Sequence, residues 1–239
     1  MRVYLRMYQS KKILAHLPIK GNSERIPGKN FKNWNGRPLF TVVLDTLLSL
    51  DWLDAVIINT DVPEKVRSFA KNDSRLIIKE RPVAICGDFV SMNRVISDDL
   101  SSVDADVHIM THATNPLISA HTITSALHRY IEVVDLGVHD SLFSVNCFQN
   151  RFYRSNGQPI NHDPDVLLRT QDLDPVYEEN SLLYIFTRDS FRLTDARIGR
   201  KPAMFTTPPQ ESIDIDDLWG WDLSVLMTAM QFGNNSSAK

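Results

Sequence analysis

The feature that most constrains this fold is a regular alternation of short apolar runs with amphipathic segments. The apolar runs are rich in β-branched and aromatic residues, which is typical of strands in a sheet covered on both faces. Between them, apolar residues recur at helical spacing. Strands are expected at 12–19, 55–60, 75–79, 107–112, 142–147, 182–187, 203–207 and 212–216, and helices at 38–50, 63–72, 119–134 and 217–230. This order predicts an α/β protein with a mostly parallel sheet and helices on both sides.

Composition narrows the possible functions. The chain has 239 residues, of which 43% are hydrophobic and 23% charged, and its formal net charge is -3. One domain over residues 1–239 fits this length. A charge so close to neutral gives no sign of a nucleic-acid partner. No run approaches the ~18 apolar residues of a membrane helix. The basic residues 1–12 lack the apolar core of a signal peptide, so a cytoplasmic protein is expected by default.

The alternation is interrupted at residues 148–178, a segment rich in polar residues, proline and aspartate. Within it, Asn156 and Gly157 form a dipeptide that is a strong signal for a hairpin turn. Insertions of this length generally serve a purpose. Two interpretations stay open here: a hairpin arm that reaches a second subunit, and a solvated lid.

A cluster of cations follows the first expected strand. The segment HLPIKGNSERIPGKN, residues 16–30, carries Lys20, Arg25 and Lys29 close to Gly21. Ligands of open α/β sheets bind beyond the carboxyl ends of the strands, and glycine lets backbone amides approach an anion there. The spacing matches neither a Walker A loop nor a dinucleotide-binding motif. By composition alone, the loop is either a small-anion site or a solvated basic turn.

Six segments, taken in order, resemble the signature of the acylneuraminate cytidylyltransferase family, the CMP-sialic acid synthetases and their relatives. The first, LPIKGNSERIPGKNFKNWNGRPLF at 17–40, resembles the family's opening strand, basic loop and G-x-P-L turn. The others are INTDVPEKV (58–66), ERPVAICGDFVS (80–91), HATNPLIS (112–119), RTQDLDPVYEENSLLYIF (169–186) and QESIDIDD (210–217). The likeness spans roughly residues 13–232.

The resemblance implies a three-layer, Rossmann-like nucleotidyltransferase fold. It also implies transfer of CMP from CTP to a hydroxyl of a 2-keto sugar acid, with release of pyrophosphate. Such catalysis rests on positioning and on stabilising the spreading negative charge. Lys29, Lys20 and Arg25 are then expected to contact the phosphates of CTP. The other nucleotide contacts that the resemblance implies are Gly21, Ser23, Asn30, Arg81 and Ser91.

The motif SIDID, residues 212–216, is the expected metal site. If these residues form a strand, alternation places Asp214 and Asp216 on one face, with Cα atoms ~7 Å apart. Two carboxylates so close together are costly unless a cation lies between them. Mg²⁺ is the hard cation expected beside triphosphate oxygens. From the residues alone, an edge strand with a solvated acidic face is the alternative.

On the acceptor side, the resemblance implies contacts from His112, Asn180, Arg169 and Gln171. For Asn180, a turn-forming residue before a buried strand is the alternative interpretation. The family's insertion is a dimerisation arm that reaches into the neighbouring active site. The resemblance therefore implies a homodimer built through residues 148–178, with CTP and a small anionic acceptor as its ligands.

The sequence departs from the family pattern in three places. Ile118 and Thr170 stand where relatives carry arginine, and Lys20 stands where they usually do. Because bidentate arginine is not easily replaced, the acceptor stays open among sialic acid, another nonulosonic or ulosonic acid, and a phosphonate. Two other functions are kept as alternatives: a nucleotidyltransferase for sugar 1-phosphates, and a catalytically degenerate nucleotide-binding protein.

Overall fold

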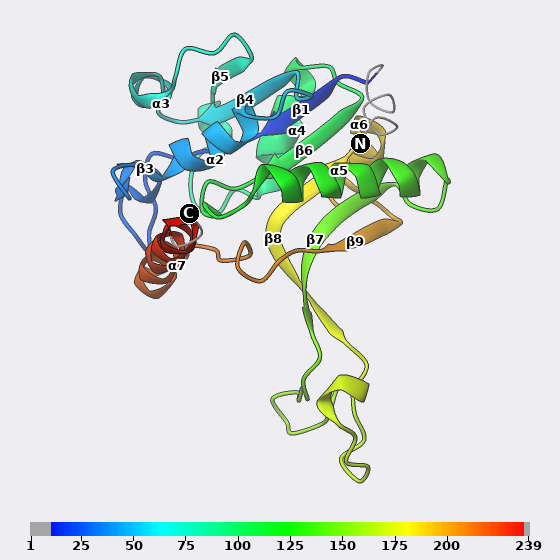
Figure 1. The fold of residues 1–239 in the computed structure, drawn as a ribbon. Helices are drawn as coiled ribbons and strands as arrows, with labels where there is room; N and C mark the ends of the chain where they lie inside the picture. Colours follow the sequence, from blue (N-terminus) through cyan, green and yellow to red (C-terminus); the bar gives the residue numbers. More distant parts are fainter. Residues whose placement is uncertain (1–10, 237–239) are drawn as a thin grey trace.

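The computed structural model describes residues 11–236, and their side chains as far as residue 230. Its centre is a seven-stranded sheet in the order β5-β4-β1-β6-β8-β7-β9. Neighbouring strands are parallel except at β8, which is antiparallel to both β6 and β7. The strands are β1 (Ile13–His16), β4 (Ala55–Thr60), β5 (Leu76–Glu80), β6 (Val107–Thr111), β7 (Ser141–Phe148), β8 (Val176–Phe186) and β9 (Pro202–Thr206). The mostly parallel sheet expected from the sequence is confirmed (Figure 1).

Helices cover both faces of the sheet, so the fold has three layers (Figure 1). Apolar residues of α2 and α5 pack into the main core on one face, and α4 and α6 pack against Met110, Tyr184 and Phe186 on the other. The helices are α2 (Leu39–Leu48), α3 (Pro63–Phe69), α4 (Met92–Ser102), α5 (Ala120–Asp135), α6 (Arg188–Thr194) and α7 (Leu218–Ser236), with single 3-10 turns η1 (Lys29–Phe31), η2 (Val83–Ile85) and η3 (Thr170–Asp172). None of the helices in the described part of the chain is long and apolar enough to cross a membrane.

One expected strand is wrong. Residues 212–216 run as an irregular segment into α7 and do not pair with the sheet. The backbone amide of Ile215 donates to the carbonyl of Thr114 over 2.8 Å, and the amide of Asp216 folds back on the carbonyl of Asp214 over 3.1 Å. The apolar and acidic alternation of SIDID therefore reflects a buried Ile215, which is fully enclosed, beside two carboxylates in a bent segment.

Two short strands that the sequence did not indicate form a small hairpin before α2. They are β2 (Asn33–Trp34) and β3 (Arg37–Pro38). Asn35 and Gly36 join them with φ angles of 49° and 89°, the left-handed pair that a tight hairpin turn requires. The hairpin places Trp34 against the first half of α7, where the indole Nε1 of Trp34 donates to Ser224 over 2.9 Å.

The segment between β7 and β8 leaves the sheet as an arm (Figure 1). We define the arm as residues 149–175. Within the arm, Gly157 adopts a φ of 83° and its amide donates to the carbonyl of Arg154 over 2.9 Å, which confirms the turn expected at Asn156-Gly157. A single bridge between Tyr153 and Pro159 completes this small hairpin.

Candidate active site

A cleft of about 320 Å³ opens at the carboxyl edge of the parallel strands. The segments that line it follow β1, β5 and β6, where ligands of α/β sheets bind. The expected site residues that the structure brings together here are Lys20, Ser23, Arg25, Lys29, Asn30, Arg81, His112 and Asp216. Most of the predicted nucleotide contacts therefore share one cavity.

The loop between β1 and β2 takes its shape from glycine at one position. Gly28 has a φ of 63°, which begins the tight turn that carries Lys29 and Asn30 into the cleft. Gly21 does not line the cleft. Its amide donates to Asp61 Oδ1 over 2.7 Å, and a Cβ at this position would lie 2.6 Å from a methyl group of Val62. Glycine is thus required at Gly21 for packing.

Lys29 is the buried cation of the cleft. Its side chain is 9% exposed and joins the loop after β1 to the segment before α7: Nζ donates to the carbonyl of Ile215 and stands 3.6 Å from Asp216 Oδ1. Burial lowers the pKa of Lys29 below its usual 10.5, and the nearby carboxylates Asp216 and Asp214 oppose that shift. The ammonium group is thereby fixed in place and poorly hydrated, which strengthens its pull on a further anion.

The two outer cations of the cleft already hold carboxylates. Arg25 Nη1 lies 2.6 Å from Asp216 Oδ2, and Lys20 is paired with Asp88. These pairs are well exposed, so each contributes little to stability. A ligand with several phosphate oxygens competes readily with a single carboxylate for such cations.

Asp214 has a carboxylate oxygen without a hydrogen-bond partner in the described part of the chain. Its Oδ1 is buried and accepts no hydrogen bond within the described chain. Desolvation raises the pKa of Asp214 above its usual 3.8, and a hydrogen bond to Thr114 opposes the shift. Asp214 does not line the cleft, and the oxygens of Asp216 already face Arg25 and Lys29. The two carboxylates nevertheless supply the type of oxygen ligand that a hard cation prefers. Among the described residues no group of three or more His, Cys, Asp or Glu side chains forms a metal cluster, so the cation would need further oxygen ligands from the substrate.

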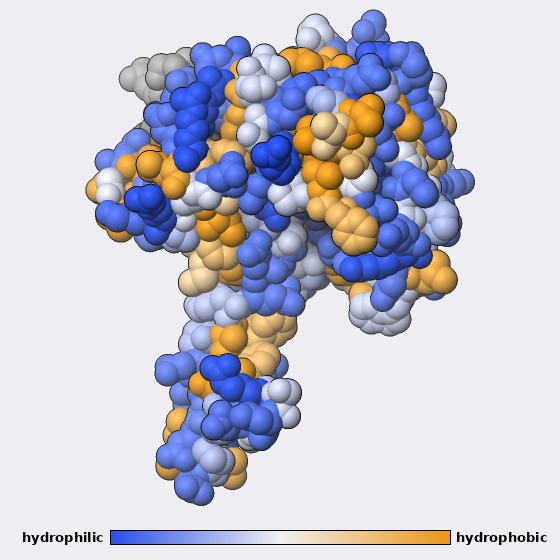
Figure 2. All heavy atoms as spheres, turned by 180° about the vertical axis from the view of Figure 1, so that it is seen from behind, coloured by the Kyte–Doolittle hydropathy of each residue, from blue (hydrophilic) through white to orange (hydrophobic). Residues whose placement is uncertain are grey.

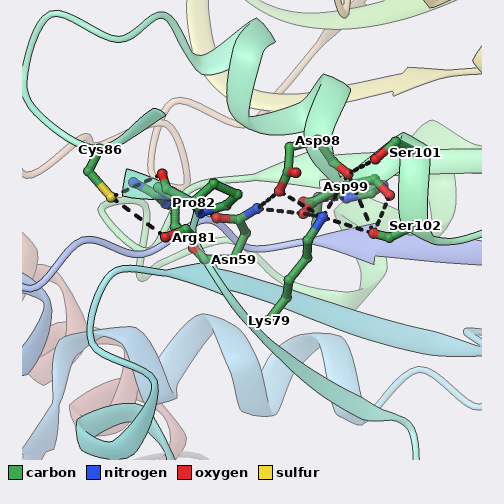
Figure 3. A network of polar contacts seen from close by, with 10 residues as sticks. Asn59, Lys79, Arg81, Pro82, Cys86, Asp98, Asp99, Ser101 and Ser102 are labelled. Carbon is green, nitrogen blue, oxygen red and sulfur yellow. Dashed lines mark hydrogen bonds and ion pairs between the residues drawn. The ribbon is translucent and has the colours of Figure 1, made fainter. Parts of the chain in front are cut away.

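Arg81 reaches the cleft from the end of β5 and is anchored from behind (Figure 3). Its Nε donates to Asn59 Oδ1 over 2.9 Å, and Nη2 donates to the carbonyls of Asn59 and Ile19 over 2.8 and 3.1 Å. Burial lowers the pKa of Arg81 below its usual 12.5. Arg81 is 7% exposed. Its guanidinium can therefore face a ligand only with the edge that does not bind Asn59 and Ile19.

Behind Arg81 lies a buried polar chain that the sequence did not reveal. Asn59 Nδ2 donates to Asp99 Oδ1 over 2.7 Å and to Asp98 Oδ2 over 3.0 Å (Figure 3). Asp99 Oδ2 contacts His16 Nδ1 over 3.1 Å, and His16 Nε2 contacts His108 Nδ1 over 2.9 Å. The one signal in the sequence was polar residues inside apolar runs, such as His16 in ILAHLPI.

His112 is the only expected acceptor contact that lines the cleft. Although part of its surface faces the cavity, burial lowers its pKa from 6.5 to about 3, with help from Arg197 and Lys29. His112 is thus neutral at physiological pH.

The other expected acceptor contacts lie elsewhere. Asn180 is buried in a polar cluster of the sheet: its Oδ1 accepts from Ser144 over 2.6 Å, and its Nδ2 donates to Thr207 over 2.7 Å. Arg169 and Gln171 belong to the arm, where Arg169 pairs with Asp172 over 2.7 Å. Figure 1 shows the arm directed away from the body that holds the cleft.

Ser91, expected at the nucleotide, lines a neighbouring hollow rather than the cleft itself.

An open α/β sheet with a basic, carboxylate-bearing cleft at its carboxyl edge is the architecture of a nucleotide-binding α/β protein. The family model described as cytidylyltransferase matches residues 17–210. The chain belongs to this family.

Two curated relatives illustrate the likeness. The chain is 27% identical over 225 residues to N-acylneuraminate cytidylyltransferase of Oncorhynchus mykiss, a match that covers 90% of this chain and 50% of that protein. It is 24% identical over 219 residues to pseudaminic acid cytidylyltransferase of Campylobacter jejuni, covering 87% of this chain and 92% of that protein. The chain thus spans about half the length of the first relative and most of the second.

Solved structures share the fold at low identity. The structure of CMP:2-keto-3-deoxy-manno-octonic acid synthetase complexed with CTP has a TM-score of 0.62 and 15% identity, covering 92% of this chain and 99% of that one. The 4-diphosphocytidyl-2C-methyl-D-erythritol synthase from Anaerococcus prevotii has a TM-score of 0.64 and 12% identity, covering 95% and 99%. These likenesses confirm the expected Rossmann-like nucleotidyltransferase fold.

Proposed function

We propose that this protein transfers CMP from CTP to a hydroxyl of a 2-keto sugar acid and releases pyrophosphate. The observation that carries the proposal is the meeting of Lys29 and Asp216, from opposite ends of the chain, in a cleft of a cytidylyltransferase-family fold. A fixed cation next to an acidic pair is what a nucleoside triphosphate and its counter-ion require.

The basic loop would hold the triphosphate. In the proposed arrangement, Lys29, Lys20 and Arg25 bind the phosphates that leave as pyrophosphate, and Ser23 and Asn30 help to orient the nucleotide. The acceptor hydroxyl attacks the α-phosphorus in line, the bond to the bridging oxygen breaks, and the developing charge is stabilised by these cations. Lys29 contributes most to this charge stabilisation, because it is the least solvated of the three cations.

Arg81 is the proposed reader of the base. Its guanidinium is fixed by Asn59 and the carbonyl of Ile19, so it presents the same edge to every ligand. A fixed donor discriminates well between bases because a mismatched partner leaves it unsatisfied. Ser91, which directly precedes the cleft-lining Met92, is kept as a proposed contact of the nucleotide.

Mg²⁺ is the proposed metal, and when bound it would neutralise charge on the phosphate oxygens and activate the attacking hydroxyl. Asp214 and Asp216 would hold it, Asp214 through the buried Oδ1 that has no partner in the described chain. His112 is a poor candidate for the base, because a group with a pKa of about 3 holds a proton weakly at neutral pH. Its proposed part is to orient the acceptor by a hydrogen bond.

The names of the relatives favour a nonulosonic acid as the acceptor, of the N-acylneuraminate or pseudaminic acid type. The cleft's balance of charge is compatible with an acidic sugar, since its cations outnumber the carboxylates that line it.

We also propose that the protein is a homodimer built through the arm. The arm exposes apolar side chains that find no cover within the described chain (Figure 2). The most exposed is Leu167 at 89%. Exposed apolar sets of this kind mark protein interfaces, and packing on a second copy would cover them. Arg169 and Gln171 would then act in the partner's site. The apolar residues concerned are Tyr153, Ile160, Val166, Leu167 and Leu168.

The test is a turnover assay. The protein is incubated with Mg²⁺, with CTP or UTP, and with one of three sugar acids: N-acetylneuraminate, pseudaminate or 2-keto-3-deoxy-manno-octonate. Parallel reactions contain a sugar 1-phosphate or 2C-methyl-erythritol 4-phosphate, and pyrophosphate and the nucleotide-linked product are measured. Turnover with CTP and at least one of these acids is expected. A preference for UTP, or turnover only with sugar 1-phosphates or 2C-methyl-erythritol 4-phosphate, would overturn the proposed substrate class. Tight CTP binding with no turnover on any acceptor would identify a degenerate nucleotide-binding protein.

A further inference from the structure

A second hollow, of about 290 Å³, lies beside the cleft, and Met92 stands in the walls of both. Its lining includes Asn93, Glu179, Arg197 and Ile198. The residues come from the start of α4, from β8 and from the segment between α6 and β9. None of the steps described above uses the charged groups of this hollow.

Arg197 is held there by an aromatic ring and has no anionic partner among the described residues. Its guanidinium carbon lies 4.0 Å from the centroid of the Tyr184 ring, and Nη2 donates to the Tyr184 hydroxyl over 3.2 Å. Nη1 lies 3.8 Å from Met110 Sδ. Within residues 11–230, Arg197 forms no ion pair; the nearby carboxylate of Glu179 instead accepts the hydroxyl proton of Tyr184. Because Arg197 is only half-buried and lines the hollow, its guanidinium charge is accessible to an anion that enters there.

Arg197 lies close to the wall of the cleft that carries His112. Met110 lies near the end of β6, two residues before His112, and Arg197 contacts its sulfur. Among the charged groups around His112, Arg197 contributes most to its lowered pKa, after the effect of burial itself. Arg197 therefore stands behind the wall of the cleft on which the acceptor is proposed to lie.

The chemistry of the proposed acceptor explains why a cation is needed at that place. In a 2-keto sugar acid, the carbon that bears the reacting hydroxyl is bonded directly to the carboxylate carbon. Any group that binds the carboxylate must then stand within a few ångströms of the site of attack. The positions where relatives carry arginine do not supply it: Ile118 is buried in the main core at 3% exposure, and Thr170 lies on the arm.

We propose that Arg197 binds the carboxylate of the acceptor, which enters the second hollow; this rests on the proposed sugar-acid substrate. The planar guanidinium suits two parallel hydrogen bonds to a carboxylate. Stacking on Tyr184 fixes its orientation beforehand, so less rotational freedom is lost when the acid binds. Met92, shared by both cavities, would then separate the carboxylate from the nucleotide.

The experiment compares an acid with its uncharged analogue. N-acetylneuraminate and its C1 amide are titrated into the full chain by calorimetry, without nucleotide, so that binding is measured apart from turnover. The variants are Arg197→Met, which keeps a long stem on Tyr184, and Arg197→Lys, which keeps the charge. Arg192→Met is the control, because Arg192 is exposed on α6 and pairs only loosely with Asp189, 4.0 Å away. Melting temperatures verify that each variant folds.

The wild type is expected to prefer the acid over the amide by roughly 10- to 150-fold, the worth of a hydrogen-bonded charge pair. Arg197→Met should abolish the preference, Arg197→Lys should restore part of it, and Arg192→Met should match the wild type. In turnover, the KM for CTP should change less than about 2-fold in all variants. A purely structural role for Arg197 would lower the melting temperature and leave the preference unchanged.

Two results would overturn the carboxylate site: a wild type with no preference for the acid, or an Arg197→Met variant that retains it. The proposed function fails separately, if no acid supports release of pyrophosphate from CTP while the preference still depends on Arg197. If Arg197→Met leaves turnover with the acid unaffected, the proposed function stands and the proposed carboxylate site is wrong.

Discussion

The cleft and the arm differ in the environment of their side chains. In the cleft, charged groups face one another within one chain: Lys29 has a side chain only 9% exposed and reaches the segment before α7. On the arm, apolar groups face outward, and Leu167 is 89% exposed. In the proposed function, one chain supplies the nucleotide half of the cleft, and the side chains of the arm act on a second copy. The predictions below test that division.

The largest effect is expected from Lys29→Met, which removes the buried cation and keeps its apolar stem. If Lys29 stabilises the leaving phosphates, kcat/KM for CTP should fall by at least about 100-fold, comparable with removal of one donor from a charge-stabilising site. Steady-state pyrophosphate release measures this. Lys32→Met is the matched control: Lys32 stands three residues further on, 4.8 Å from the Trp221 ring centroid, outside the cleft. Near-wild-type turnover by Lys29→Met would remove its proposed role.

A tenfold effect is expected from Asn59→Ala, which releases Arg81 without touching the cleft. Arg81 loses the acceptor of its Nε, so the KM for CTP should rise about 10-fold, equivalent to about 1.4 kcal/mol, with a smaller change in kcat. Thermal unfolding should also occur at lower temperature, because the buried Asp99 loses one of its hydrogen-bond donors.

Ser101→Ala is the control for that experiment, since Ser101 is exposed at the edge of the same network and donates only to the carbonyl of Asp98. An unchanged KM in Asn59→Ala, together with a lowered melting temperature, would make the network structural and leave Arg81 orientation to other contacts.

The division between what the sequence predicted and what it missed follows from the range of the interactions. The seven strands of the central sheet were predicted because each contains a local run of apolar residues. Helices α2 and α5 were predicted because their apolar faces are continuous. Helix α4 was missed because Asp99, which faces the sheet, interrupts its apolar repeat to meet His16. In that helix, a polar network replaces part of the core and removes the signal.

The candidate site shows the same limit. The basic loop and the SIDID segment were each recognised in the sequence, but their meeting depends on the whole sheet. Arg197 lacks any local motif, because its importance comes from the Tyr184 ring and from the absence of a carboxylate partner within the described residues. Contacts between distant segments are set by tertiary packing, which single-sequence patterns do not encode.

A smaller effect, of about 1 kcal/mol, is expected on stability when Asp214→Asn replaces the buried carboxylate. The folded-state pKa of Asp214 is raised, so its contribution to stability is fully present below its usual value of 3.8 and is lost as pH rises through the raised value. At neutral pH without ligands, the variant should therefore melt at a higher temperature than the wild type. The difference should shrink in acid.

Adding CTP with Mg²⁺ should reverse the order in that experiment, because the wild type alone would bind the cation tightly and gain stability from it. Calorimetric melting at several pH values, with and without these ligands, gives both comparisons. A variant less stable than the wild type at neutral pH, with no ligand effect in either, would contradict a metal role for Asp214.

The smallest effect on nucleotide binding is expected from shortening the arm. Replacing residues 150–174 with a short glycine-containing turn keeps the β7–β8 pair from Phe148 and Val176 inward, and the cleft lies on other elements. The affinity for CTP should change less than about 2-fold, because no arm residue lines the cleft. The mass measured by light scattering should fall from that of two chains to that of one, since the exposed apolar set is removed.

Leu167→Glu makes the same test with one residue. An exposed substitution shifts the stability of a single chain by only about 0.5 kcal/mol, yet a charge at the centre of a dimer contact separates the copies. A wild-type mass of one chain at micromolar concentration would contradict dimerisation through the arm. A shortened variant that loses CTP binding would contradict a nucleotide site that needs no arm residue.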